Sequence, residues 1–113
     1  MPRSMPAPDL VRGTLEMLIL HTLTIRPMHG YAVAKHIADR SGDVFQVGQG
    51  SLYPALERLL SQGLVTAKWG DSPTGRKARY YTITAAGRRR LGQEISEFDT
   101  ALAAIARVME SAT

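Results

Sequence analysis

Basic side chains gather in one stretch of this sequence, and their chemistry is the easiest to interpret. The segment 68–90 holds one acid, Asp71, and seven basic residues: Lys68, Arg76, Lys77, Arg79, Arg88, Arg89 and Arg90. Its formal charge is therefore +6, while the whole chain carries +4. One concentrated basic region on a near-neutral body is typical of a protein that binds a polyanion. The alternative is a solvated face that only keeps the protein soluble.

A second candidate site is the polar start of a helix predicted within "GQGSLYPALERLL", residues 48–60. Ser51 is expected as the N-cap, which places Pro54 at the third helical position, where a missing N–H breaks no bond. Short hydrogen-bonding side chains at the N-terminal turn of a recognition helix suit the major groove. The residues expected to contact DNA here are Gln49, Ser51, Tyr53 and Pro54, with Arg58 either at a phosphate or in solvent. The alternative is an ordinary capped core helix in which Tyr53 is partly buried.

A basic hairpin is predicted directly after this helix. The runs 64–70 and 78–84 are rich in β-branched and aromatic residues, and turn-forming residues separate them. Alternation along the second run turns Tyr81 and Ile83 toward the core and Tyr80 the other way, where it could help to position a phosphate. Basic residues near a hairpin tip can contact phosphates or the minor groove. The residues expected in this role are Gly75, Arg76, Lys77, Arg79 and Tyr80. The alternative is a charged tip that serves solubility.

The surrounding pattern predicts the elements that position these residues. Apolar periodicity predicts helices over 9–25 and 30–40, with His29 as a cap or packing residue before the second. The loop 43–50 offers Val44, Phe45 and Val47 as anchors into the core. Helix, helix, helix, hairpin, helix is the order of a winged helix-turn-helix, so the expected fold class is mainly α with a small β-hairpin. We expect a disordered arm at 1–8, a DNA-binding domain at 9–84 and a C-terminal dimerisation helix at 85–113.

The last helix, expected over about 85–111 with Thr84 as its cap, carries an apolar stripe. Its members recur at intervals of four and three: Leu91, Ile95, Phe98, Leu102, Ile105 and Met109. A repeat of 3.5 residues is the pattern of a coiled-coil interface. The stripe could instead pack on the first helix of its own domain, and both arrangements could hold together. A pair of such helices would give a two-fold axis and place two recognition helices roughly 34 Å apart.

Several classes of site have no support in the sequence. The chain has no cysteine, and its histidines show no metal-ligand spacing, so we expect no metal, cofactor or enzymatic activity. Ser51 has no histidine in a recognisable triad pattern. No apolar run approaches the roughly 20 residues that span a bilayer. We therefore expect a cytoplasmic protein without a membrane partner.

Three stretches together resemble PadR-like transcriptional regulators: "MHGYAVAKHI", "GQGSLYPALERLLSQGLV" and "GRKARYYTITAAGRRRL". The resemblance covers about residues 10–91. It implies a winged helix-turn-helix homodimer of the short C-terminal-helix type. It also implies that Ser51, Tyr53 and Pro54 lie on the recognition helix and that Gly75, Arg76, Lys77 and Arg79 lie on the wing. Leu60 departs from the family, which often has an acid there. Some similar proteins bind a small hydrophobic effector between subunits through a tryptophan on the last helix. The one tryptophan here, Trp69, falls in the first strand of the hairpin, so an effector of that kind has no support in these residues.

These observations predict a sequence-specific DNA-binding transcription regulator. The expected partners are a double-stranded operator and a second copy of the chain. The expected role is repression of its own or a neighbouring operon. The rival interpretation is a winged-helix interaction module whose recognition helix faces a protein and binds no operator.

Overall fold

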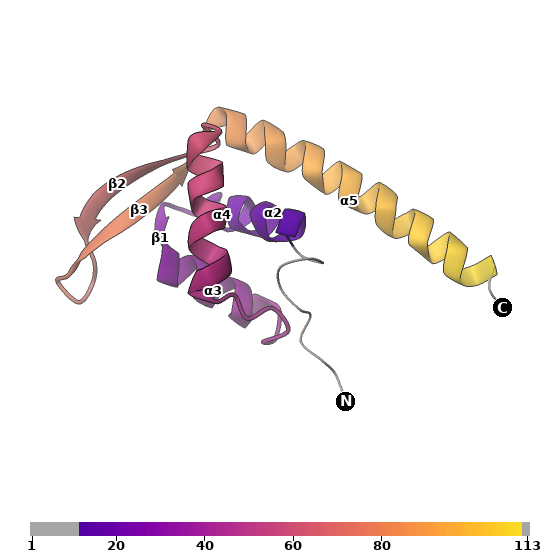
Figure 1. Cartoon of the computed structure of the whole chain (residues 1–113), viewed down its shortest axis with the longest axis horizontal. Coiled ribbons are helices and arrows are strands. Elements are labelled where there is room, and N and C mark those ends of the chain that lie inside the picture. Colours follow the sequence, from indigo (N-terminus) through magenta and orange to yellow (C-terminus); the bar gives the residue numbers. More distant parts are fainter. Residues whose placement is uncertain (1–11, 112–113) are drawn as a thin grey trace.

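A computed structural model describes residues 12–111 of the chain (Figure 1). The elements follow the order α2 (Arg12–Leu23), β1 (Met28–His29), α3 (Gly30–Arg40), α4 (Gln49–Ser61), β2 (Val65–Asp71), β3 (Lys77–Ile83) and α5 (Ala85–Ser111). The mainly helical winged helix-turn-helix arrangement is as predicted. The expected arm at 1–8, and the expected start of the first helix at Asp9, lie outside the described residues. No helix within residues 12–111 is long and apolar enough to cross a membrane.

Helix α3 begins and ends where the sequence predicts. His29 precedes it, and the Nδ1 atom of His29 accepts a hydrogen bond from the Ala32 backbone N–H at 3.2 Å. This bond satisfies one of the free donors of the first turn, which confirms His29 as a cap. Gly42, just beyond the C-cap Ser41, has a φ of +60°, a conformation that favours glycine. The preceding helix, α2, ends at Leu23 rather than Ile25.

The sheet has three antiparallel strands in the order β1-β3-β2. The register of the hairpin pairs Val65 with Ile83 at its base and Asp71 with Lys77 near its tip. Strand β1 was not predicted, because two residues are too short to show a period. No strand is predicted between the helices expected over 9–25 and 30–40, yet Met28 pairs with Tyr81 and is buried.

The core lies where the three helices of the domain meet the base of the sheet. Phe45 and Val47 pack against it as predicted, whereas the prediction for Val44 is wrong because 47% of Val44 is exposed. The most deeply buried large side chains are Ile19, Leu20, Leu23, Val33, Leu56, Leu59 and Val65. The hydrophobic effect therefore fixes α4 and the base of the hairpin on one body.

Helix α5 starts on this body and then leaves it. The Thr84 hydroxyl accepts from the Gly87 N–H at 3.0 Å and donates to the Gly63 carbonyl at 2.8 Å, so Thr84 is the predicted cap. Gly87 lies so close to Leu64 that a Cβ there would collide with the Leu64 carbonyl oxygen. Farther along, α5 extends away from the rest of the structure (Figure 1).

Candidate nucleic-acid interface

The first turn of α4 begins earlier than the sequence predicts. Gly48 is the N-cap, with an extended backbone, and its carbonyl accepts from the N–H groups of Ser51 and Leu52. No side chain caps the helix, so the prediction of Ser51 as the N-cap is wrong. Ser51 is instead the third helical residue, because the helical hydrogen bonds already begin at the Gly48 carbonyl.

Pro54 is consequently the sixth helical residue rather than the third. At this position the proline lacks the N–H that would donate to the Gly50 carbonyl four residues before it. That carbonyl is left as an acceptor without a helical partner in a turn where Gln49, Gly50 and Pro54 are all exposed. The start of α4 therefore presents uncharged side chains together with free backbone groups.

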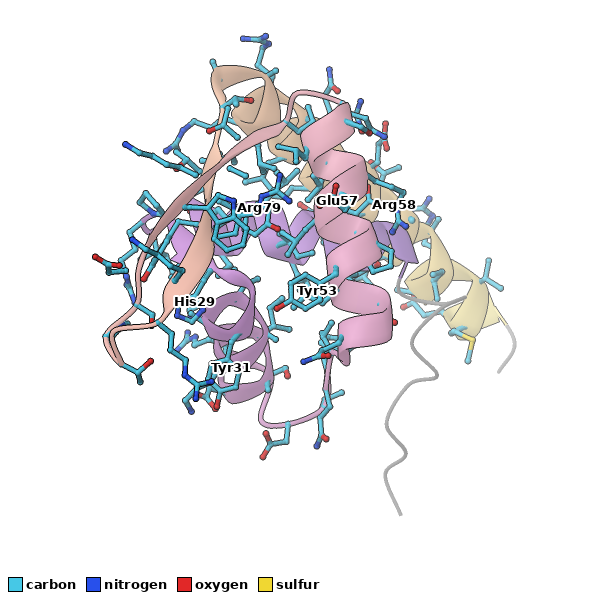
Figure 2. The ribbon with its side chains drawn as sticks, turned by 60° about the vertical axis from the view of Figure 1, so that its left-hand side comes forward. His29, Tyr31, Tyr53, Glu57, Arg58 and Arg79 are labelled. Carbon is cyan, nitrogen blue, oxygen red and sulfur yellow. The ribbon has the colours of Figure 1, made fainter. Side chains whose placement is uncertain are left out.

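Tyr53 joins α4 to α3 and also keeps an exposed surface. A Cβ built on Gly30 would lie 3.0 Å from both Cε1 and the hydroxyl oxygen of Tyr53. The ring thus packs closely over the first residue of α3, and a Cβ there would press against it. Tyr53 nevertheless remains 41% exposed. In Figure 2, Tyr53 lies on α4, and its partial burial leaves its predicted contact with DNA a prediction.

The hairpin tip holds its cations outward on a tight turn. Gly75 has a φ of +85°, and the Ser72 N–H donates to the Arg76 carbonyl at 2.8 Å. Arg76 is exposed and forms no ion pair with any residue from 12 to 111. Lys77 lies 3.0 Å from Asp71 Oδ1, with both side chains more than 70% exposed, so this pair contributes little stability. Both cations are accessible to an anion.

Arg79 turns toward α4 rather than toward open solvent. Its Nη1 donates to Glu57 Oε1 at 3.0 Å, and its guanidinium lies 5.8 Å from the centre of the Tyr81 ring. Burial raises the pKa of the Tyr81 hydroxyl, so this ring is neutral at physiological pH. Tyr81 and Ile83 are buried, as alternation predicts. The pair between Arg79 and Glu57 links the hairpin to α4, although both side chains are partly exposed.

Two predicted DNA-binding side chains have partners within the domain. Arg58 Nε lies 2.7 Å from Glu16 Oε2, and both side chains are largely covered, so Arg58 ties α4 to α2 instead of lying in solvent. In Figure 2, Arg58 and Arg79 lie on opposite sides of α4. The Tyr80 hydroxyl donates to the Asp71 carbonyl at 3.1 Å, and the Tyr80 ring meets His29 edge-on. Its proton is therefore already used, whereas a phosphate would need it.

A hollow of about 440 Å³ separates α4 from the hairpin. The sequence analysis assigned no function to three residues that line it: Tyr31, Glu57 and Trp69. Tyr31 and Trp69 are among the most exposed aromatic residues, at 70% and 67%. A signal existed for Trp69, because it continues the core-facing alternation of Val65 and Ala67 past the point where the core ends. A second hollow, of about 620 Å³, lies between α3 and α4 and includes Gln49 and Tyr53.

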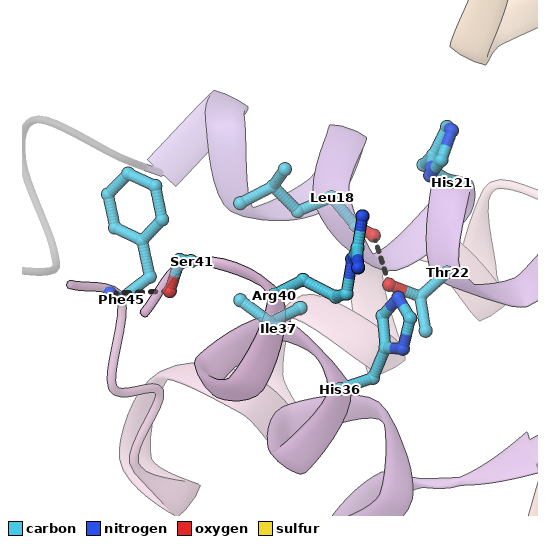
Figure 3. Close-up of a pocket in the computed structure, with 8 residues that line it drawn as sticks. All are labelled: Leu18, His21, Thr22, His36, Ile37, Arg40, Ser41 and Phe45. Carbon is cyan, nitrogen blue, oxygen red and sulfur yellow. Dashed lines mark hydrogen bonds between the residues drawn. The ribbon is translucent and has the colours of Figure 1, made fainter. Parts of the chain in front are cut away.

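A smaller hollow of about 200 Å³ lies between α2 and α3 (Figure 3). Its walls are apolar at Leu18, Ile37 and Phe45, with His36 and Arg40 beside them. The Thr22 hydroxyl at its edge donates to the Leu18 carbonyl at 2.8 Å. None of the residues expected to contact DNA lines it. Within residues 12–111, no three side chains of the metal-binding types are grouped closely enough to hold an ion.

The apolar stripe on α5 divides into a buried and an exposed part. Leu91 is 7% exposed and belongs to the core of its own domain, so its assignment to a dimer interface is corrected. The next members become steadily more exposed, from 38% at Ile95 to 65% at Met109. We call this exposed part the seam; its residues are Ile95, Phe98, Leu102, Ile105 and Met109. Packing on the domain's own first helix therefore accounts for Leu91 but not for the seam.

Comparison with known proteins identifies relatives that share this sequence and fold. Residues 19–93 match the transcriptional regulator PadR-like family. The chain is 32% identical over 86 residues to "Transcriptional regulator Rv3488" of Mycobacterium tuberculosis, an alignment that covers 76% of this chain and 77% of the relative. A crystal structure of a PadR family transcriptional regulator from Eggerthella lenta aligns with a TM-score of 0.78 and 32% identity, covering 90% of this chain and 87% of that one.

A transcriptional regulator from Clostridium thermocellum aligns with a TM-score of 0.82 at 25% identity, over 88% of this chain and 97% of that chain. The 88% of the chain that aligns must include at least part of α5 as well as the winged helix. The chain belongs to the PadR-like family of transcriptional regulators.

Proposed function

We propose that this chain is a sequence-specific DNA-binding regulator. In this proposal it acts as a homodimer on a double-stranded operator and represses its own or a neighbouring operon. Membership of a family of transcriptional regulators supports the general role, and the surface around α4 and the hairpin supports the specific one.

The observation that carries the proposal is that α4 and the cationic end of the hairpin border one hollow, which Tyr53 and Lys77 both line. Gly75 turns the chain so that Arg76 and Lys77 project into solvent. Cations at a hairpin tip bind phosphates without reading sequence. At the start of α4, Gln49 and Gly50 are exposed and present hydrogen-bonding groups without charge. This division of labour suits a protein whose hairpin supplies affinity and whose helix supplies specificity.

The seam supports the homodimer. Five large apolar side chains at a spacing of 3.5 residues are exposed on one face of α5. Leaving such a stripe in water is unfavourable, and a second copy of the same stripe buries it by coiled-coil packing. Because the dimer is symmetric, it presents two copies of α4 to two half-sites. A dimer that occupies a promoter in this way would exclude the transcription machinery from the same DNA.

Charge reversal at the hairpin tip tests the proposal. We expect Arg76→Glu/Lys77→Glu to lower affinity for duplexes from the promoter of the chain's own gene by about a hundredfold or more at moderate salt. The slope of log affinity against log salt should fall by about two per protomer, because two phosphate contacts are lost. The measurement is a salt series of equilibrium titrations, with folding checked by circular dichroism.

A matched control separates local contact from general charge. Arg107→Glu makes the same charge change as Arg76→Glu alone, but on α5, away from the seam, at an exposed position. It should change affinity by no more than about twofold, compared with about tenfold for Arg76→Glu. Unchanged operator binding in the double variant would contradict the proposal and favour a protein-interaction module.

A further inference from the structure

The tryptophan on β2 is largely exposed and lies outside the hydrophobic core. Trp69 pairs across the hairpin with Arg79 and lies on the same face as Tyr81 and Val65. Tyr81 and Val65 are only 2% and 1% exposed, whereas Trp69 is 67% exposed. A large apolar ring held in solvent costs free energy unless a partner covers it.

The surroundings of Trp69 indicate the chemistry of that partner. Trp69 lines the aromatic hollow, which we define by Tyr31, Tyr53, Glu57, Trp69, Lys77 and Arg79. Two cations border it, and its one carboxylate, Glu57, is already paired with Arg79 at 3.0 Å. Tyr31 stands 70% exposed at the opposite wall, with its ring stacked near His29. Flat aromatic walls with an excess of positive charge suit a nucleic-acid strand, which offers sugar and base surfaces along a line of phosphates.

The position of the hollow indicates which part of a DNA duplex would contact it. In the proposed complex α4 occupies a major groove and the hairpin tip occupies the adjacent minor groove. Neighbouring grooves of a duplex are separated by one sugar-phosphate strand, so that strand must pass between α4 and the hairpin. The aromatic hollow is the space between those two elements (Figure 2).

We propose that Trp69 is a DNA-contacting residue that packs its ring on a deoxyribose of the strand separating the two grooves. Lys77 then lies beside a phosphate of the same strand. This inference rests on the proposed function and adds to it an apolar contact that the cationic tip cannot provide. Coulombic contacts to phosphate weaken as salt rises, whereas the burial of an aromatic ring does not. Trp69 thus supplies a share of the affinity that is insensitive to salt.

Trp69 is the sole tryptophan of the chain, so its emission reports on this contact directly. Titration of the full-length protein with a duplex from the promoter of its own gene should shift or quench that emission in step with binding. We expect Trp69→Ala to lower affinity about tenfold at every salt concentration, with the salt slope unchanged. Trp69→Phe, which keeps a flat ring, should recover most of the loss.

Two further variants serve as controls for this inference. Thr66→Ala changes an exposed residue on the other face of the same strand and should leave affinity unchanged. Glu57→Gln removes the carboxylate of the hollow and should tighten binding about threefold, because the strand no longer passes a negative charge. Unchanged melting temperatures would show that these exposed substitutions leave the fold intact.

The outcomes distinguish this inference from the function on which it rests. If the wild type binds the duplex while its emission stays constant and Trp69→Ala binds equally well, the inference is overturned and the proposed function stands. If the wild type binds no duplex from its own promoter, the proposed function fails first. A loss in Trp69→Ala that disappears at high salt would also contradict the inference, because it would show a charge effect.

Discussion

The β2–β3 hairpin and helix α5 are both anchored in the core at one end and project from it at the other. In the hairpin, Val65 is 1% exposed at the base and Trp69 is 67% exposed four residues later. In α5, Leu91 is 7% exposed and Met109 is 65% exposed. Each element keeps its periodicity beyond the core, so the face that was turned inward becomes a surface available to a partner.

The difference between the two projections lies in what that face carries. Beyond the core, the hairpin continues with a tryptophan among cations, whereas α5 continues with uncharged apolar side chains in the seam. A cationic, partly aromatic projection is suited to a polyanion, and an apolar one to a copy of itself. In both elements the side-chain periodicity continues beyond the core, and the two resulting surfaces suit different partners.

The contrast between the hairpin and α5 requires the seam to be an interface between two copies of the chain. Phe98→Glu/Leu102→Glu places two like charges on each of two facing helices, so we expect a monomer in sedimentation. Operator affinity should fall by a factor on the order of 10² to 10⁴, because two linked half-site contacts become one. Gln93→Glu/Thr100→Glu adds the same charges on the opposite side of α5 and should leave the dimer intact. A persistent dimer in the first variant would move the interface elsewhere.

The anchored base of α5 should respond to a change that its free end tolerates. Gly87→Ala drives a methyl group into the Leu64 carbonyl and toward Ile83, where a Cβ would lie 2.8 Å from Cγ1. We expect a loss of about 2–4 kcal/mol in the free energy of unfolding, measured by chemical denaturation. Gly92→Ala, five residues along the same helix with open space around it, should gain about 0.5–1 kcal/mol. Equal effects at the two glycines would show that the base of α5 is not packed as described.

The smallest effect is expected where α5 leaves the core, at Glu94. Burial raises the pKa of its carboxyl, with Glu16 and Glu97 adding to this and Arg90 opposing it, and its buried Oε1 has no hydrogen-bond partner within residues 12–111. Because the pKa of Glu94 in the folded state lies above its ordinary value of 4.5, protonated Glu94 adds to the free energy of unfolding below pH 4.5. This contribution is lost as the pH rises through the folded-state pKa.

Glu94→Gln should therefore raise the melting temperature slightly at pH 7, by about 2 °C or less, and leave it unchanged near pH 4. The measurement is a thermal melt at both pH values. A lower melting temperature for the variant at pH 7 would mean that the ionised carboxylate has a favourable partner.

The sequence predicts the elements of this fold well, because most of them are long and strongly periodic. Alternation places Tyr81 and Ile83 inward, and Thr84 marks the start of α5, as observed. Strand β1 could not be predicted, since its two residues form only by pairing with β3, far along the chain. The predicted start of α4 is wrong because the helix is capped by Gly48, which has no side chain to mark the N-cap in the sequence.

The candidate site was harder to predict than the fold. Residue type identifies Arg76, Arg79 and Arg58 equally as cations, but only the tertiary structure shows which have partners. Arg76 is free of ion pairs among the described residues, whereas Arg79 is paired with Glu57 and Arg58 with Glu16. The sequence places Trp69 on the first strand of the hairpin but not in the candidate site, because its exposure depends on how far the hairpin extends past the core.

The most direct test of a dimeric operator-binding regulator is a footprint of the purified protein on the DNA upstream of its own gene. Two protected segments related by a two-fold axis are expected, with centres about 10 base pairs, or a small multiple of that, apart. The Phe98→Glu/Leu102→Glu variant should lose both segments at the same concentration. A wild-type protein that leaves this DNA uniformly accessible, or protects a single segment without symmetry, would contradict the account.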